Sequence, residues 1–536
     1  MCLAEPRSEA AGEKGARDMD TIDEARRGSA RRRSLTKRRR IRASALVLTA
    51  AIVAGACGSA MAIPTPTGGA TPTPWPTYSF WPTSSPSPWQ TPSPSPSETP
   101  TPSLVATPSP SQTGAPGNFE IAMGNAGLLA PAADDGALAG SEINAFAFDL
   151  LRQLDPTGNL CASPTSVALA LAMVRPGARG ATATEMDKVL HDFGSTGQAS
   201  EIVALLQALH SVTAYDDSDW YSDDPEATPD HTNQVPAVEL DVSNAVFSQQ
   251  GMNLEQAYLD ALSSGFGAGV GLLDYKNDPE KARLIINKWA SERTKGRIPE
   301  VLQPGDITNA TRIALANAIY LKAAWDNQFD PKATKTLPFT RSDGSRVSVP
   351  TMAMDQLLQY AAGKGYRAVE LPMGGHFNGA YGTLSMTIVV PDDMTSFVNG
   401  LTTAELAGIV SGARAYDVDL TLPRFSAESR VDLADALKAM GMTALFDPDS
   451  ADLSGITTDE TLFIAKVIHQ ANIDVDEEGT TASAVTVVSG QGMAGPGPGP
   501  THVQLHVDKP FLYFIRETTT GAVLFMGRIA DPSASS

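Results

Sequence analysis

One stretch decides the fold: Glu477-Glu478-Gly479-Thr480-Thr481-Ala482-Ser483-Ala484. Every side chain from Gly479 to Ala484 is small, yet the stretch lies between two apolar blocks, residues 462–475 and 502–515, that are typical of buried strands. Small residues make a poor core strand. They suit a segment that is exposed in one state and enters a sheet in another, where its inward side chains must fit against close neighbours.

This stretch resembles the hinge of a serpin, a family of suicide inhibitors of serine and some cysteine proteases. In serpins an exposed reactive loop follows the hinge. A protease cuts the loop, and the freed amino-terminal side enters the main sheet as a new strand before the acyl-enzyme is released. The resemblance therefore implies an α+β fold of three β-sheets surrounded by about eight or nine helices, with an exposed reactive loop. It also implies an endopeptidase inhibitor, not an enzyme.

Further segments match the serpin pattern in the family's order, so the resemblance extends over residues 143–529. They include a predicted helix at 143–151, a predicted strand at 384–391 and a predicted amphipathic helix at 431–440. Other matches include Thr294-Lys295-Gly296-Arg297-Ile298, Val349-Pro350-Thr351-Met352, Val369-Glu370-Leu371-Pro372, Leu422-Pro423-Arg424-Phe425, Ala451-Asp452-Leu453-Ser454-Gly455, Asp508-Lys509-Pro510-Phe511 and Phe525-Met526-Gly527-Arg528. We assign residues 141–536 to this serpin-like domain.

Polar groups in apolar surroundings mark the centre of the predicted main sheet. Asn317 interrupts the apolar run 313–321, and a buried amide needs a hydrogen-bond partner. The resemblance implies a shutter, where strands of this sheet part, made of Ser163, Ser166, Asn317 and His469. It pairs Asn317 with His469 and places Trp325 at the breach, the end of the sheet where insertion begins. The residues alone leave open that Ser163 is only a helix cap and His469 an ordinary core histidine.

The reactive bond is predicted at Met493–Ala494, by counting from the hinge at the spacing usual in inhibitory serpins. The methionine, and the lack of Lys or Arg between Glu477 and Lys509, favour subtilisin-like, elastase-like or chymotrypsin-like targets over trypsin-like ones. Two hinge residues depart from the inhibitory pattern. Thr481 stands where glutamate is usual, and Val485 is bulkier than the usual residue. The alternative is therefore a non-inhibitory serpin-fold protein that serves as a binding or scaffold module at the cell surface.

The first 57 residues are predicted to be an export leader. A region rich in Lys and Arg precedes an apolar run at 45–56, which is too short to span a bilayer and ends in small residues. Cys57 directly follows them, as in a bacterial lipobox, and is therefore a candidate lipid anchor. Ordinary cleavage near Ala62 and a twin-arginine signal at Arg32-Arg33 are the alternatives.

Residues 58–140 are predicted to be a disordered stalk rich in Pro, Ser and Thr, because such a segment buries too little apolar surface to offset its ordering entropy. We expect the protein to be extracellular, either secreted or lipid-anchored at a bacterial cell surface, with the anchor as its only membrane contact. The acidic stretch 215–230 lacks the spacing of a calcium loop and is predicted to be a solvated insertion.

Composition and motifs exclude several other functions. The formal net charge of −20, which becomes more negative once the basic leader is removed, argues against nucleic acid as a partner. Three cysteines, two of them in the leader, leave Cys161 without a disulfide partner. No motif of a serine hydrolase, zinc protease, phosphate loop or dithiol site is present, so we expect no cofactor and no metal. His502 and His506 are four residues apart in a strand-like run, a spacing at which two histidines do not readily share a zinc ion. The expected partner is a target serine protease that binds a monomer.

Overall fold

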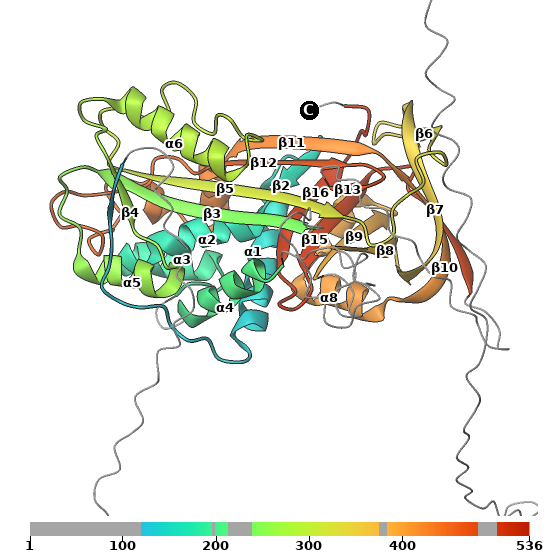
Figure 1. The fold of residues 1–536 in the computed structure, drawn as a ribbon, viewed down its shortest axis with the longest axis horizontal. Helices are drawn as coiled ribbons and strands as arrows, with labels where there is room; N and C mark the ends of the chain where they lie inside the picture. Colours follow the sequence, from blue (N-terminus) through green and yellow to red (C-terminus); the bar gives the residue numbers. More distant parts are fainter. Residues whose placement is uncertain (1–118, 196–198, 213–237, 375–382, 481–500, 535–536) are drawn as a thin grey trace, which may run out of the picture. The chain divides into compact units, whose positions relative to one another are not determined.

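The structure is a computed structural model that describes residues 119–195, 199–212, 238–374, 383–480 and 501–534 (Figure 1). All of them belong to one unit of the chain, Glu98–Ser536. Several predicted features lie outside the described residues: the leader with Cys57, residues 58–118 of the stalk, the whole acidic stretch 215–230, Thr481 to Ala484 of the hinge and the Met493–Ala494 bond. No helix in the described part of the chain is long and apolar enough to cross a membrane.

Nine α-helices occur in the described residues, which agrees with the predicted number. They are α1 (Asp135–Gln153), α2 (Pro164–Val174), α3 (Gly180–Val189), α4 (Ala199–His210), α5 (Gln256–Phe266), α6 (Pro279–Arg293), α7 (Met394–Gly400), α8 (Thr403–Gly412) and α9 (Ala434–Met440). Two short 3-10 helices, η1 (Arg175–Gly177) and η3 (Ala444–Phe446), follow α2 and α9.

A seven-stranded sheet forms one layer of the fold. In spatial order its strands are β1 (Glu120–Ala122), β4 (Val270–Leu273), β3 (Val238–Gln249), β5 (Ile313–Ala324), β13 (Gly479–Thr480), β12 (Ile468–Val475) and β11 (Phe425–Asp432). The short strand β13 is antiparallel to both β5 and β12, so β5 and β12 run in the same direction. Figure 1 shows α6 on one side of this sheet and α1, α2 and α4 on the other.

A second, nine-stranded sheet contains the remaining strands. They are, in order, β14 (His502–His506), β10 (Arg414–Pro423), β7 (Arg346–Gly363), β8 (Tyr366–Met373), β9 (Leu384–Pro391), β15 (Phe511–Glu517), β16 (Val523–Ile529) and β2 (Leu160–Ala162), with β6 (Lys335–Thr340) beside β7. The long strand β7 pairs with β6 and β10 over most of its length and with β8 at its end. The predicted second and third sheets therefore share β7 and form one hydrogen-bonded sheet.

The helix α2 lies between the two sheets, since it packs against β3 and β5 of one and β16 of the other. All of its residues are buried, as expected for a helix whose sequence is apolar nearly all round. Each large side chain that it buries contributes about 1.5–3 kcal/mol to stability. Ser163 accepts a hydrogen bond from the backbone N of Ser166 and so caps the helix, and Pro164 occupies the first position. This fixes the start of α2 beneath the middle of the main sheet.

Residues 119–140, which composition assigned to the stalk, contain regular structure. The strand β1 pairs with β4, and α1 begins at Asp135. The ring of Phe119 packs edge-on against that of Phe247 in β3, with centroids 5.2 Å apart. These contacts place the start of the folded part before residue 141.

Two predicted elements are shorter than their sequence patterns. The apolar block 462–475 is a strand only from Ile468, and the helix predicted at 431–440 begins at Ala434. Val431 lies in β11, opposite His469 of β12, because strand pairing outweighs its helical spacing. Gly441 ends α9 with a φ of +112°, in the left-handed conformation that glycine adopts readily.

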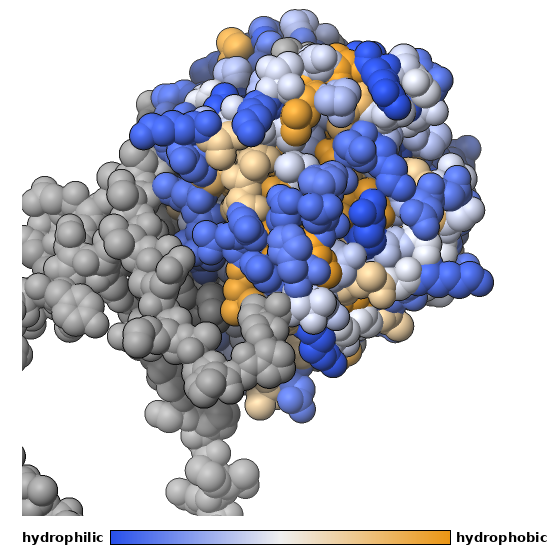
Figure 2. All heavy atoms as spheres, turned by 90° about the vertical axis from the view of Figure 1, so that its right-hand side faces the viewer, coloured by the Kyte–Doolittle hydropathy of each residue, from blue (hydrophilic) through white to orange (hydrophobic). Residues whose placement is uncertain are grey.

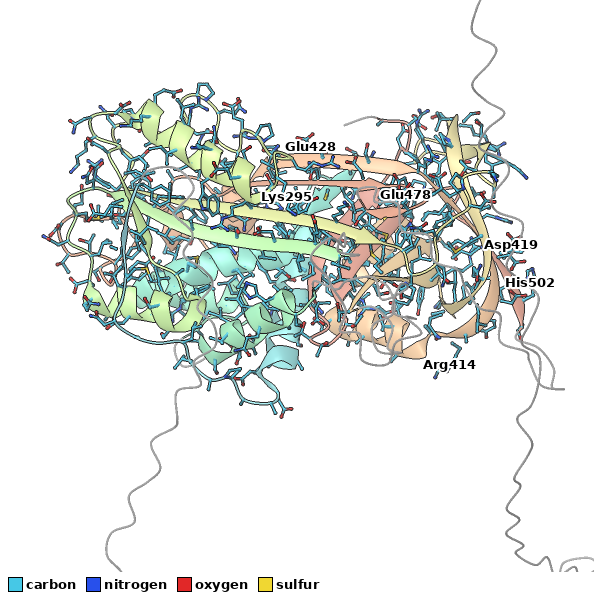
Figure 3. All side chains as sticks on the ribbon, viewed as in Figure 1. Lys295, Arg414, Asp419, Glu428, Glu478 and His502 are labelled. Carbon is cyan, nitrogen blue, oxygen red and sulfur yellow. The ribbon has the colours of Figure 1, made fainter. Side chains whose placement is uncertain are left out.

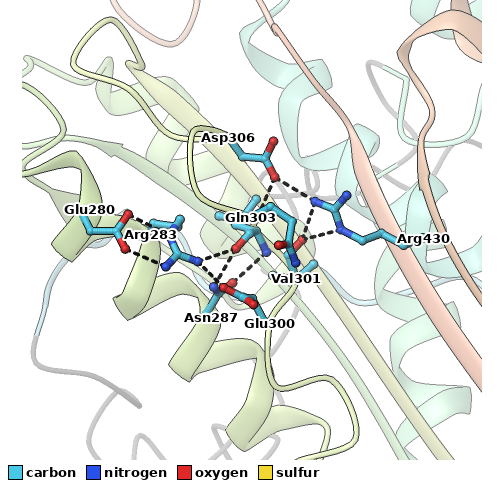
Figure 4. A network of polar contacts seen from close by, with 9 residues as sticks. Glu280, Arg283, Asn287, Glu300, Val301, Gln303, Asp306 and Arg430 are labelled. Atoms are coloured by element: carbon cyan, nitrogen blue, oxygen red, sulfur yellow. Dashed lines mark hydrogen bonds and ion pairs between the residues drawn. The ribbon is translucent and has the colours of Figure 1, made fainter.

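A polar network holds the segment between α6 and β5 in place (Figure 4). Arg283 of α6 donates a 2.7 Å hydrogen bond to the Leu302 carbonyl and pairs with two glutamates. Asp306 accepts hydrogen bonds from Arg430 of β11 at 2.8 Å and from Lys466 at 2.7 Å. The network thus connects the β5 side of the main sheet with the β11–β12 side, at the end away from β13.

Candidate functional site

The chain leaves β12 through a tight turn and returns as β13. The carboxylate of Asp476 accepts a 2.9 Å hydrogen bond from the Glu478 backbone N, and the Asp476 N donates to the Gly479 carbonyl at 3.1 Å. Gly479 has a φ of +150°, and a Cβ there would lie 2.1 Å from the Ala323 carbonyl oxygen. Only glycine fits this close approach to β5.

Gly479 and Thr480 already occupy the main sheet. Thr480 pairs with Ala323 of β5 on one side and Val475 of β12 on the other, and only 1% of its surface is exposed. The Ala323 backbone N also donates to Thr480 Oγ1 at 3.1 Å. The sequence predicted that the hinge lies outside the sheet before cleavage. For Gly479 and Thr480 that expectation is wrong, because the neighbouring strands β5 and β12 both offer backbone hydrogen-bond partners.

Glu477, at the tip of the turn, is a buried carboxylate with a cation beside it. Arg424 donates to its Oε1 from Nε at 2.9 Å and from Nη2 at 2.6 Å, and the Thr334 hydroxyl donates to the same oxygen. Burial raises the pKa of Glu477, but the hydrogen bonds from Arg424 and Thr334 outweigh it, so the pKa lies below its ordinary value. The charged side chain therefore fastens the turn to neighbouring elements.

Trp325 lies directly after β5 and contacts the same turn. Its indole Nε1 donates to the Asp476 carbonyl at 2.9 Å, and its backbone N donates to the Glu478 carbonyl at 3.0 Å. The indole is buried and packs edge-on against Phe329. Trp325 thus stands where β13 enters the sheet; that it controls insertion stays a prediction.

The first turn of α2 contacts both β5 and β12. The backbone N of Ser163 donates to Nε2 of His469 at 2.9 Å, and Nδ2 of Asn317 donates to the Ser166 carbonyl. The structure therefore brings the four residues of the predicted shutter together. The helix start joins two strands whose facing edges are not paired with each other in the described residues.

Asn317 and His469 do not bond to each other, contrary to the prediction. Asn317 donates instead to Oδ1 of Asn244 on β3 at 2.8 Å, in addition to Ser166. The reason is the strand order, since the position of β13 separates β5 from β12. The Oδ1 of Asn317, the Oγ of Ser166 and the Nδ1 of His469 have no hydrogen-bond partner in the described residues.

Burial lowers the pKa of His469 to about 4, because the interior disfavours the imidazolium. The ring is therefore neutral at pH 7. Since Nε2 accepts from the Ser163 N–H, the proton of the neutral ring is on Nδ1.

Cys161, the free cysteine, is also buried, and burial raises the pKa of its thiol to about 12. An un-ionised thiol of this kind is a core residue, as its isolation in the sequence indicated.

Three residues of this site escaped the sequence analysis: Asn244, Thr334 and Arg424. Arg424 was noted only as part of a matching segment. The one signal in the sequence for such a partner was Glu477 itself. A carboxylate beside a hinge that enters a sheet is expected to be buried, and a buried carboxylate requires a cation nearby. Nothing in the spacing could say which arginine would supply it.

Comparisons with known proteins agree with this arrangement. The family model described as "Serpin (serine protease inhibitor)" matches residues 141–532. Leukocyte elastase inhibitor from Xenopus laevis is 32% identical over 399 residues, which cover 72% of this chain and 97% of that protein. Serpin B3 from Homo sapiens is 33% identical over 402 residues, covering 73% and 99%.

Solved structures show the same fold. The thermophilic serpin tengpin in its native state aligns with a TM-score of 0.63 and 22% identity, covering 76% of this chain and 97% of tengpin. Maspin aligns with a TM-score of 0.62 and 23% identity, covering 74% of this chain and all of maspin. The predicted α+β serpin fold and the prediction of an inhibitor in place of an enzyme are confirmed. The chain belongs to the serpin family of serine protease inhibitors.

Proposed function

We propose that this chain traps its target as an acyl-enzyme by inserting the cleaved loop between β5 and β12. One observation carries the proposal: β13 begins at the hinge and already pairs with both strands through Gly479 and Thr480. Beyond these residues, the described parts of β5 and β12 have no backbone pairing with each other. A chain that continues from Thr480 would therefore find a partner on each side.

The register of β13 supports this path. When the pairs Thr480–Ala323 and Thr480–Val475 are extended, the position six residues after Thr480 comes level with Asn317 on one side and with His469 on the other. That position is Thr486, and the alternation of side chains puts it on the same face as Thr480. A threonine hydroxyl can donate and accept, so it suits the unpartnered Oδ1 of Asn317 and Nδ1 of His469.

We further propose that the cleaved bond is Met493–Ala494 and that the target is elastase-like, subtilisin-like or chymotrypsin-like. The methionine suits the apolar specificity pockets of these proteases. The names of the relatives, which include leukocyte elastase inhibitors, support the elastase-like choice.

The test is to mix the full chain with elastase and with subtilisin. An inhibitor gives a covalent complex that survives boiling in detergent, together with a peptide whose mass corresponds to a start at Ala494. Thr486→Pro is the matched control, because proline in the middle of the new strand prevents its pairing while leaving the bond unchanged. It should be cut at the same bond without forming a complex. Cleavage of the parent with no complex would instead identify a non-inhibitory serpin-fold protein.

We propose that the protein is exported and attached to the bacterial surface through a lipid on Cys57. The basic region, the apolar run and the small residues before Cys57 support this proposal. Cys57→Ser should move the protein from the detergent-soluble membrane fraction to the medium. Unchanged fractionation of this variant would contradict lipid attachment at Cys57.

A further inference from the structure

Three side chains of the types that can bind a metal lie together near the β14 edge of the nine-stranded sheet. Asp355 is on β7, Asp417 on β10 and His502 on β14, and these strands are neighbours in this order. One donor atom from each residue lies within 4.8 Å of the others, and Nδ1 of His502 is 3.4 Å from Oδ2 of Asp417. Figure 3 labels His502 at this edge, and Figure 2 shows that this side of the molecule is mainly hydrophilic.

The charges of this cluster are not balanced by a basic side chain. Asp417 is paired only with His502, and no Lys or Arg forms an ion pair with Asp355 or Asp417 in the described residues. The carboxylates of Asp355 and Asp417 lie close together on the neighbouring strands β7 and β10. Like charges on neighbouring strands destabilise a sheet, so a bound cation would remove an unfavourable contact.

We propose that Asp355, Asp417 and His502 bind one divalent metal ion of the zinc type. One imidazole nitrogen and two carboxylate oxygens are ligands that Zn²⁺ accepts, and three protein ligands leave a fourth position for water. Two ligands bound at about 2 Å in a tetrahedral site lie roughly 3.3 Å apart, close to the separation of His502 and Asp417. Asp355 is exposed, so its side chain is free to move onto the ion.

The ligands come from three strands, which explains why the sequence predicted no metal. His506, the histidine considered with His502, lies further along β14 and contacts the Thr421 hydroxyl at 3.0 Å. The site instead uses neighbours across the sheet. Calcium fits poorly, because it requires six to eight oxygen ligands.

The ion would fasten β14 to the sheet. This strand comes directly after the loop, stands at the sheet edge and pairs only with β10 in the described residues. A metal held by β7, β10 and β14 ties this edge strand to two others. The inference depends on the cross-strand geometry and does not rest on the proposed loop insertion.

The experiment titrates the chelator-treated full chain with Zn²⁺ alone by isothermal calorimetry. His502→Gln should bind one zinc ion fewer than the parent, or bind it with an affinity at least about tenfold lower. Mutation of residues that only hydrogen-bond to a metal's ligands already lowers metal affinity by about this factor. Asp417→Asn and Asp355→Asn should do the same. His506→Gln, a change of the same type on the same strand, should bind zinc like the parent. Zinc should raise the melting temperature of the parent and of His506→Gln, but not that of Asp417→Asn.

Several results would overturn the proposal. One is full zinc binding by His502→Gln, and another is an equal loss in His506→Gln. A third result uses Co²⁺ as a spectroscopic substitute for Zn²⁺. An intense sulfur-to-metal absorption band that disappears when a cysteine is replaced would show that the ion binds at that cysteine and not at this cluster. Equal melting temperatures of parent and variants in chelator establish that the variants are folded, and because Asp355 is exposed, Asp355→Asn remains a test if another variant misfolds.

Discussion

His469 is a titrating group inside the main sheet, and its pKa determines part of the response to acid. In the unfolded chain the imidazole has its ordinary pKa of 6.5, but in the fold the value is about 4. The unfolded chain therefore takes up the proton first as the pH falls. Stability from this residue is complete above about pH 6.5 and is lost as the pH falls toward 4.

We predict that acidification from pH 7 to 4.5 lowers the free energy of unfolding by about 2–3 kcal/mol through His469. Urea unfolding at the two pH values measures the difference. His469→Gln, which cannot take up the proton, should show a smaller pH dependence even if it is less stable at both. An equal dependence in parent and variant would mean that the imidazole is charged or exposed in the fold.

Thr480→Arg tests the hinge at the level of one side chain. From the sequence, we would expect the arginine to matter only during insertion and to leave the native protein nearly unchanged. Because Thr480 is already buried between β5 and β12, we now predict a loss of native stability of about 1–3 kcal/mol as well. Complex formation with protease should also be lost, whereas Thr480→Ser keeps both properties. Trapping by the arginine variant as efficient as that of the parent would show that insertion does not require a small side chain at position 480.

Residues such as Asn317 and Ser163 were predictable because a polar group stands out in an apolar run or at a helix start. The partners of these groups were not. Asn244 looks like an ordinary residue of β3, and Arg424 lies between β10 and β11; their roles come from the spatial arrangement of the strands, which the linear pattern does not contain. The mistaken Asn317–His469 bond has the same cause.

Among the elements, the turn before β13 is held in part by the Arg424–Glu477 ion pair. Removal of Arg424 would leave the buried carboxylate of Glu477 with only Thr334 as a side-chain partner. We predict that Arg424→Met lowers the free energy of unfolding by about 2 kcal/mol, while the double variant with Glu477→Gln recovers much of the loss. Urea unfolding of the two single variants and the double variant, as a double-mutant cycle, measures this coupling.

The same pair has a pH signature. Because the folded pKa of Glu477 is below its ordinary 4.5, the pair contributes stability above that value and loses it as the pH falls through the folded pKa. Arg424→Met should therefore reduce the drop in stability below pH 4.5. Independent effects of the two changes at every pH would show that the side chains do not interact.

At the scale of the whole molecule, the proposed mechanism requires a fold that gains stability when its loop is cut. A strand added between β5 and β12 forms backbone hydrogen bonds on two edges, each worth about 1 kcal/mol. We predict that cleavage within 481–500 raises the melting temperature by about 10 °C or more, since 1 kcal/mol corresponds to about 2 °C in a large domain. Calorimetry of intact and cleaved protein measures the shift. The Thr486→Pro variant, once cut, should show little increase; a cleaved parent that melts with the intact one would exclude insertion.

Most of the architecture could be predicted from the sequence, since the order of matching segments indicated the serpin fold and the strand at β9 matched its apolar run. The early start of the fold at β1 and α1 was missed, because β1 is only three residues long and its pairing partner, β4, lies far along the chain. The division into sheets was also beyond the sequence. A strand as long as β7 joins two sheets only if different strands pair with its two ends. Which strands pair with it depends on the spatial order of the strands, which the sequence does not give.

The shared strand β7 has a consequence for how disturbances spread. It is continuous from its pairing with β10, which lies next to β14, to its pairing with β8, which lies next to the buried β9. A displacement of the edge strand β14 is therefore transmitted through β10 and the continuous backbone of β7 to the hydrophobic interior. Opening of β10 and β14 is therefore coupled through β7 to the pairing of β8 and β9.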